Sequence, residues 1–178
     1  MRRVSFIIPL LHLGQNVQPL PLADVSCPDP SSNAQPTFHI SDFSYSEAVT
    51  GGSEASLSRV IDVSFGVTNS AISTSSVTAC TIHDSLDQGQ TWDAKTMHAC
   101  SGGGAQTQFA FDSSNNSLTI VQSWTCSQPS GNAESYRATG SGIVPLTCKV
   151  HNATHEAQCD MASANIRGVI SRSSHALS

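Results

Sequence analysis

Hydrophobic and polar residues alternate along short stretches of this chain, and turn-forming residues separate the stretches. The clearest run is Ser58–Thr68, whose alternate apolar positions are Ile61, Val63, Phe65 and Val67. A period of two is typical of a β-strand with one buried face. Similar runs occupy Thr37–Phe43, Val77–Ile82, Thr107–Asp112, Ser117–Trp124, Glu134–Thr139, Gly142–Val150 and Asn165–Ile170. The pattern predicts an all-β fold, a single-domain antiparallel β-barrel or sandwich.

Two of these runs predict a hairpin, and another contains a proline. The turn tetrapeptide Ser113–Asn116 joins Thr107–Asp112 to Ser117–Trp124. Trp124 shares a strand face with apolar residues, so we expect it in the core. Pro145 has no backbone N–H to donate, which restricts the run around it to an edge strand or a bulge.

The N-terminal residues have the features of an export signal. A basic start, Met1 to Arg3, precedes the apolar stretch Val4 to Gly14, which is too short to span a bilayer. Ala23 offers a usable cleavage position. We therefore predict a secretory signal peptide over residues 1–23, a flexible N-terminal arm over 24–36 and a folded domain over 37–172, in a protein that is secreted and extracellular.

Composition and charge narrow the choice of partner. The formal net charge is −5, with only 12% charged residues, and loss of Arg2 and Arg3 with the leader takes it to −7. An acidic chain is not suited to nucleic acid or to an anionic membrane. We therefore expect no nucleic-acid partner, and no membrane association after signal cleavage.

Six cysteines behind an export signal predict a disulfide framework. Cys80 and Cys100 flank one polar loop, and Cys148 and Cys159 flank another. Each pair closes a short loop between adjacent β-type runs, which contributes about 3 kcal/mol on chain-entropy grounds. The remaining two, Cys27 and Cys126, pair with each other in a monomer, or Cys27 bridges to a second copy in a homodimer. An even set favours the intramolecular bridge.

Several short motifs, in this order and spacing, resemble the fungal Alt a 1 (AA1-like) secreted proteins. They are the strand Phe38–Phe43, a Cys-to-Cys loop with Trp92, the Phe-x-Phe-Asp of Phe109–Asp112, the strand Leu118–Gln122 and the pair Cys148 and Cys159. The resemblance implies an Alt a 1-like β-barrel domain over residues 37–172, a two-disulfide core and no known catalytic machinery. Members are allergens, elicitors and effectors of plant-associated fungi, and some dimerise through an N-terminal cysteine. Cys126 departs from the family pattern and offers Cys27 a partner in its own chain.

One string has the spacing of a metal site. Cys148, His151, His155 and Cys159 follow one another at intervals that suit zinc in a reducing compartment. In an exported chain the two cysteines are better explained as an oxidised pair. A glycan on the sequon at Asn152 would also crowd a ligand. We therefore expect no metal site and no cofactor.

The polar segment between Cys80 and Cys100 is the candidate partner-binding surface. It carries Trp92, Asp84, Asp87 and Asp93, together with two histidines. An aromatic residue in a polar loop is a plausible contact for a partner, and burial against the barrel is equally compatible with the sequence. The acidic and histidine side chains match no cation loop or hydrolase motif, which favours a solvated loop.

Two sequons predict glycosylation. Asn115 begins N-N-S and Asn152 begins N-A-T, and both fall in predicted turns, where a glycan can be accommodated.

The leading functional hypothesis is a secreted, non-enzymatic effector or elicitor, or an allergen-like protein, that binds a host extracellular protein in virulence or elicitation. The chain has no catalytic motif that supports an enzyme. The first alternative is a carrier that holds an apolar or phenolic small molecule in the barrel or in a dimer cleft. The second is an extracellular hydrolase that uses His83, Asp84 or His98.

Overall fold

The computed structural model describes residues 35–50, 58–72, 76–87, 89–102, 105–127, 133–151 and 156–173. These residues form nine β-strands and no helix. The strands are β1 (Thr37–Thr50), β2 (Ser58–Asn69), β3 (Thr78–Leu86), β4 (His98–Ala99), β5 (Gln106–Asp112), β6 (Ser117–Ser127), β7 (Ala133–Ile143), β8 (Thr147–His151) and β9 (Glu156–Ser173). The all-β prediction is confirmed.

None of the described segments contains a helix long and apolar enough to cross a bilayer.

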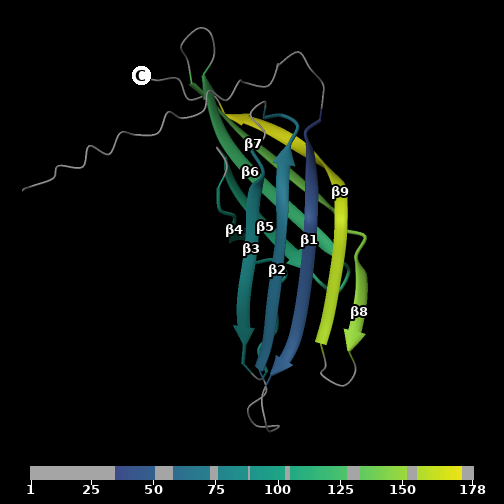
Figure 1. Ribbon diagram of the computed structural model, residues 1–178. Coiled ribbons are helices and arrows are strands. Elements are labelled where there is room, and N and C mark those ends of the chain that lie inside the picture. The colour runs from purple at the N-terminus through teal and green to yellow at the C-terminus, as the bar shows by residue number, and fades with distance from the viewer. Residues whose placement is uncertain are drawn as a thin grey trace, which may run out of the picture.

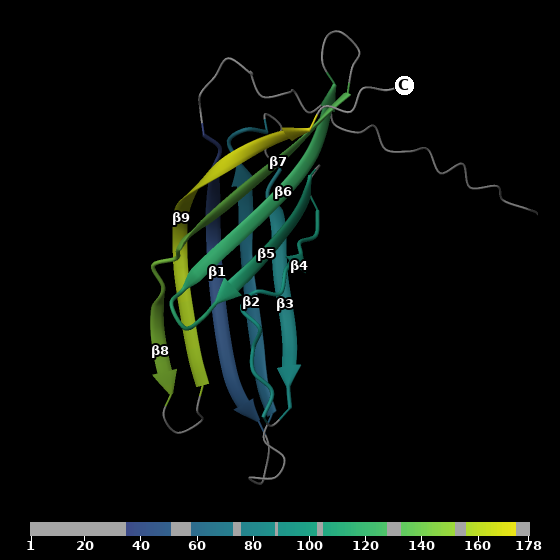
Figure 2. The ribbon, with the colours of Figure 1, turned by 180° about the vertical axis from the view of Figure 1, so that it is seen from behind.

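The strands form one antiparallel sheet that curls into a nearly closed barrel. Their order is β3-β2-β1-β9-β7-β6-β5-β4, and β8 pairs with β9 outside this path. One wall contains β1, β2 and β3, and the other contains β5, β6 and β7 (Figures 1 and 2). The long strand β9 belongs to both walls. Its first part, up to Arg167, pairs with β1, and its last part, from Gly168, pairs with β7.

Two glycines allow β9 to change partners. Gly140 and Gly168 face each other across β7 and β9. A Cβ atom would lie 2.9 Å from the Phe38 ring at Gly140 and 3.0 Å from it at Gly168. The buried ring therefore occupies the space that two side chains would need, and glycine is required where the sheet bends.

A disulfide and a single β-bridge join the two outer strands of the sheet and nearly close the barrel. Cys80 of β3 is bonded to Cys100, which follows β4, with 4.2 Å between their Cα atoms. Beside it the Ser101 N–H donates to the Ala79 carbonyl at 2.8 Å, and the Ala79 N–H donates back at 3.1 Å. The bridge joins the first and last strands of the sheet order, so it holds the seam of the barrel.

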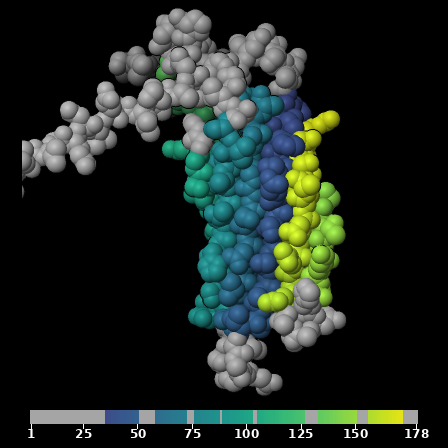
Figure 3. Space-filling view, viewed as in Figure 1, coloured from purple at the N-terminus to yellow at the C-terminus, as the bar shows by residue number. Residues whose placement is uncertain are grey.

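The second bridge fastens the edge strand β8. Cys148 is bonded to Cys159 of β9, with 4.0 Å between Cα atoms. The run Gly142–Val150 is divided at Pro145, because β7 ends at Ile143 and β8 begins at Thr147. Figure 3 shows β8 beside β9 at the margin of the front face. Both expected short-range disulfides are therefore present, and the second strand of the divided run lies at an edge.

The third expected bridge involves Cys27, which lies outside the described residues. Cys126 is buried on β6, and no cysteine among the described residues has a free thiol. The pairing of Cys27 with Cys126 stays a prediction.

The alternating pattern places the core as expected. The four apolar residues of β2, Ile61, Val63, Phe65 and Val67, are each no more than 4% exposed, and Trp124 of β6 is buried as well. Four phenylalanines from both walls meet at the centre. Ring centroids are 5.3 Å apart for Phe43 and Phe65, 5.1 Å for Phe43 and Phe111, and 4.8 Å for Phe65 and Phe109. Packed aromatic rings therefore occupy the centre of the interior, with aliphatic residues around them.

A β-bulge in β1 keeps its apolar residues facing inward. Ser41 pairs with Gly66 and Ser44 with Ser64, so β1 has one extra residue at this point. Asp42 takes a left-handed backbone conformation with φ 52°, which aspartate tolerates better than most residues. The bulge explains why three positions, rather than two, separate the buried residues Ile40 and Phe43.

A buried polar network links the two walls. The Asn69 amide of β2 donates to Gln122 Oε1 of β6 at 2.7 Å, and Gln122 Nε2 donates to the Thr107 hydroxyl of β5 at 3.0 Å. All three side chains are buried. Because these groups satisfy one another, they can be enclosed without the cost of unpaired polar atoms.

Candidate functional site

The segment between β3 and β4, residues 87 and 89–97, is called the Trp92 loop. It is shorter than the sequence indicated, because β3 continues to Leu86. Asp84 therefore lies within a strand, half-buried and opposite Ile61, rather than in a loop. Asp87 is exposed at the start of the loop, and its N–H donates to Gln90 Oε1 at 3.0 Å.

The indole of Trp92 attaches the loop to the barrel. Its Nε1 donates to the Phe111 carbonyl of β5 at 2.8 Å. The ring stacks on His98, with centroids 5.5 Å apart and planes 3° apart. Trp92 is half-buried and packs against the core. Trp92 therefore attaches the loop to the barrel while part of the side chain stays exposed, and its contact with a partner stays a prediction.

Asp93 fixes the turn that follows Trp92. Its carboxylate accepts the Lys95 N–H at 3.0 Å and the Thr96 hydroxyl at 2.8 Å. The Lys95 N–H, followed by the Thr96 hydroxyl, holds the pKa of Asp93 below its usual value. The carboxylate is thus used within the loop as a turn cap.

Replacing Trp92 by alanine should release the loop. Loss of one hydrogen bond and one ring stack removes about 1–2 kcal/mol of local stability, so trypsin should cleave after Lys95 about tenfold faster. The rate is measured by electrophoresis after reduction, because the Cys80 to Cys100 bridge holds the fragments together. Met97→Ala, an exposed change in the same loop, should leave the rate unchanged. Equal rates for Trp92→Ala and the parent protein would show that the indole does not restrain the loop.

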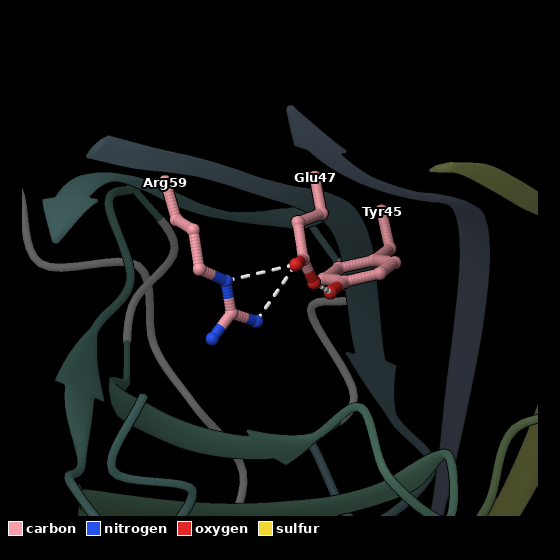
Figure 4. A network of polar contacts seen from close by, with 3 residues as sticks. All are labelled: Tyr45, Glu47 and Arg59. Atoms are coloured by element: carbon pink, nitrogen blue, oxygen red, sulfur yellow. Dashed lines mark hydrogen bonds and ion pairs between the residues drawn. The ribbon is translucent and has the colours of Figure 1, made fainter. Parts of the chain in front are cut away.

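A charged network of Tyr45, Glu47 and Arg59 lies beside Phe111 of β5. The Tyr45 hydroxyl donates to Glu47 Oε2 at 2.6 Å, and Arg59 donates to Glu47 Oε1 from Nε at 2.9 Å and from Nη2 at 2.7 Å (Figure 4). The Tyr45 ring lies 5.4 Å from that of Phe111. Burial raises the pKa of Tyr45 to about 12, and the hydrogen bond to Glu47 adds to the shift. Glu47 thus joins a buried phenol to a half-exposed guanidinium.

The raised pKa of Tyr45 predicts a loss of stability at high pH. The unfolded chain releases this proton near its usual value of about 10, and the folded chain only near 12, so the stabilisation is complete below pH 10 and lost between the two values. Between about pH 9 and about pH 11.5 the free energy of unfolding should fall by roughly 1–2 kcal/mol more than in Tyr45→Phe. Urea titrations at the two pH values measure this difference, and equal falls would contradict the shift.

The residues suggested for hydrolysis do not form one arrangement. His83 faces outward from β3, and its Nδ1 lies 2.6 Å from Asp62 Oδ1. His98 is instead half-buried in the stack with Trp92, and the ring of Phe109 lies 5.9 Å from it. Asp84 is on the opposite face of β3 from His83. Within the described part of the chain, no hydrogen bond, ion pair or ring contact joins these three side chains.

The two cysteines of the zinc-like motif form a disulfide. The sulfur atoms of Cys148 and Cys159 are bonded to each other, so neither is a thiolate ligand. His155 and the side chain of His151 lie outside the described residues. Within the described ranges, no three acidic, cysteine or histidine residues form a group that could hold a metal.

One of the two predicted glycosylation sites lies within the described residues. Asn115 is exposed in the turn between β5 and β6, and its Oδ1 accepts the Ser117 N–H at 2.9 Å. The position is open to a glycan, and its occupancy stays a prediction. Asn152 lies outside the described residues.

Concavities occur on the outside of the barrel in its described part. One of about 660 Å³ is beside the bulge at Asp42 and also borders Asp160. A second, about 290 Å³, borders the Asp62 and His83 pair. A third, about 370 Å³, is on the other wall, where Arg137 and two glutamines line it.

Two sets of residues in the structure were not predicted from the sequence. Tyr45, Glu47 and Arg59 follow the alternation of β1 and β2 inward, and two charges in inward positions could have marked them. Arg137 is the single cation in β7, and this was the available signal for the third concavity.

The chain is similar to known proteins of one family. The family model described as Alternaria alternata allergen 1 matches residues 40–162, which is well over half of the chain. Two crystal structures of the Alternaria alternata allergen Alt a 1 are similar, each at 19% identity. One covers 82% of this chain and 95% of its own with a TM-score of 0.45, and the other covers 78% and 96% with a TM-score of 0.38. No curated protein matches the chain.

Proposed function

The chain belongs to the Alternaria alternata allergen 1 family, and from this premise we propose that it is a secreted, non-enzymatic effector or elicitor that binds a host extracellular protein. Family membership makes the protein allergen-like. Its two described disulfides are consistent with an oxidising, extracellular location.

The Trp92 loop is the proposed contact surface for the partner. It is held to the barrel by the disulfide at Cys100 and by the Trp92 indole, and the Asp93 turn orders it internally. Asp87, Lys95 and Met97 are exposed on it. A loop that is ordered before binding loses little entropy when a partner docks, so its exposed side chains are well placed for recognition.

The arrangement of the other candidate groups supports recognition over the alternatives. An apolar or phenolic ligand needs interior space, and Phe43, Phe65, Phe109 and Phe111 occupy it. For a hydrolase, a base must lie within hydrogen-bond reach of a nucleophile in a concave site. The His83 and His98 side chains face opposite sides of the barrel wall instead.

The proposal is tested by capture of plant apoplastic proteins on the immobilised mature chain. A specific partner should be retained by the parent protein and lost from the double variant Asp87→Lys with Met97→Asp. The change reverses one charge and removes the exposed apolar side chain of the loop, and both residues are at the surface, so the fold should be retained.

Val169→Asp is the matched control. Val169 is exposed to 68% on β9, outside the Trp92 loop. The captured protein should remain bound to this variant. Loss of the partner from both variants, or from neither, would show that the loop is not the contact surface. Trp92→Ala should weaken capture indirectly, in proportion to its increased trypsin cleavage.

A further inference from the structure

The outer face of the wall formed by β5, β6, β7 and β9 carries a cross-strand row of polar side chains. Gln106 pairs with Ser123, Ser123 with Arg137, and Arg137 with Ser171. The adjacent row contains Gln108 and Val121, with Ala99 of β4 opposite Gln108. Figure 2 shows these strands side by side. Four residues from segments distant in sequence are therefore aligned about one strand spacing apart.

The concavity of about 370 Å³ lies between these two rows. Gln106, Gln108, Ser123 and Arg137 supply its polar rim. Val121 forms an apolar floor, being only 9% exposed although it alternates with the inward-facing Ile120 and Gln122. A site of this volume is large enough for one small organic molecule.

The rim side chains are free to bind a ligand. Other hydroxyls on this face pair with each other, as Thr119 does with Ser141 at 3.0 Å and Thr125 with Ser135 at 3.4 Å. Within the described residues, the side chains of the four rim residues make no hydrogen bond or ion pair. The hydrogen-bonding capacity around the concavity is therefore unused by the fold.

The positive charge of the lining favours an anionic ligand. The protein carries a formal net charge of −5, yet the lining contains Arg137 and no acidic residue. A guanidinium presents a planar fork that matches a carboxylate. The two amides and the serine hydroxyl both donate and accept, which suits neighbouring hydroxyl groups, and Val121 can pack against a C–H face.

We propose that this concavity, called the Arg137 pocket, binds a small hydroxylated carboxylate of the sugar-acid class. Arg137 binds the carboxylate, Gln106, Gln108 and Ser123 bind the hydroxyls, and Val121 supports the ring. This binding is separate from recognition by the Trp92 loop and does not depend on it.

The test uses D-glucuronate, D-glucose and acetate as probes, followed by amide NMR shifts of the folded mature chain. Glucuronate should shift the amides of Gln106, Gln108, Ser123 and Arg137, with a dissociation constant at least tenfold below those of glucose and acetate. Arg137→Gln should weaken glucuronate binding by about tenfold, to the level of glucose, because a charge-assisted hydrogen bond is lost.

Two further variants separate specific binding from general attraction. Arg167→Gln removes an exposed cation of the adjacent strand β9 that is not part of the lining, and should leave the affinity for glucuronate unchanged. Gln106→Ala should weaken glucuronate binding a few-fold and leave acetate unaffected. The NMR spectrum of each variant shows whether it is folded.

Three results would overturn the proposal. They are acetate binding as tightly as glucuronate, an equal loss of affinity in Arg137→Gln and Arg167→Gln, and shifts confined to amides outside the Arg137 pocket.

Discussion

Replacing Phe43 by alanine should lower the free energy of unfolding by about 3–5 kcal/mol. The Phe43 side chain is 1% exposed, and its ring contacts Phe65 and Phe111 from both walls of the barrel. Truncation leaves a cavity at the centre, where neighbouring strands are held by their hydrogen bonds and cannot collapse into it. Urea unfolding followed by circular dichroism measures the loss.

The control for Phe43 is an apolar residue at the surface. Val169→Ala removes apolar atoms from a side chain that is 68% exposed, and should change stability by no more than about 0.5 kcal/mol. A loss below about 1 kcal/mol for Phe43→Ala would mean that the aromatic cluster is not the tightly packed centre described above.

Removing the seam disulfide should have the second large effect. With Cys80 and Cys100 both changed to alanine, the loss of loop closure costs about 3 kcal/mol. The sulfur of Cys80 is also buried, with 0% exposure, so its removal adds a packing loss. We expect a total loss of about 4–5 kcal/mol in urea unfolding, and faster amide exchange at Ala79 and Ser101, where the barrel closes.

The edge disulfide provides the comparison. Cys148 and Cys159 are separated by 11 residues and the seam pair by 20, so chain entropy alone makes the seam pair stronger by only about 0.5 kcal/mol. Changing Cys148 and Cys159 to alanine should cost at least about 1 kcal/mol less than the seam change, because it frees only the edge strand β8. Equal losses would show that the seam has no special role.

A strand can be predicted from its local sequence where one of its faces is buried, because apolar and polar residues then alternate. Ile61, Val63, Phe65 and Val67 alternate without interruption, and β2 follows them. In β1 the alternation changes after Ile40, and a bulge at Asp42 restores it, so the strand continues to Thr50. A sequence window that ends at the break in the pattern detects only the first half of such a strand.

The role of Trp92 could not be settled from its neighbours in the chain. Polar residues surround it in sequence, and this pattern fits an exposed contact as well as an anchor. Its hydrogen-bond acceptor, the Phe111 carbonyl, lies 19 residues away, and its stacking partner His98 lies on the next strand. The attachment of Trp92 to the barrel depends on how the loop folds back, so only the tertiary structure could show it.

Alternation, turn residues and the positions of four cysteines are local properties of the sequence. They were sufficient to predict the fold class, the inward-facing residues and two disulfides. Features built across strands needed the three-dimensional register. Asn69 meets Gln122 across 53 positions of sequence, and Gln106, Ser123 and Arg137 line one pocket only because three strands pair in a particular register. A shift of one residue between β5 and β6 would turn Gln106 away from this row, and a shift between β6 and β7 would turn Arg137 away, so the pocket exists only in the assembled barrel.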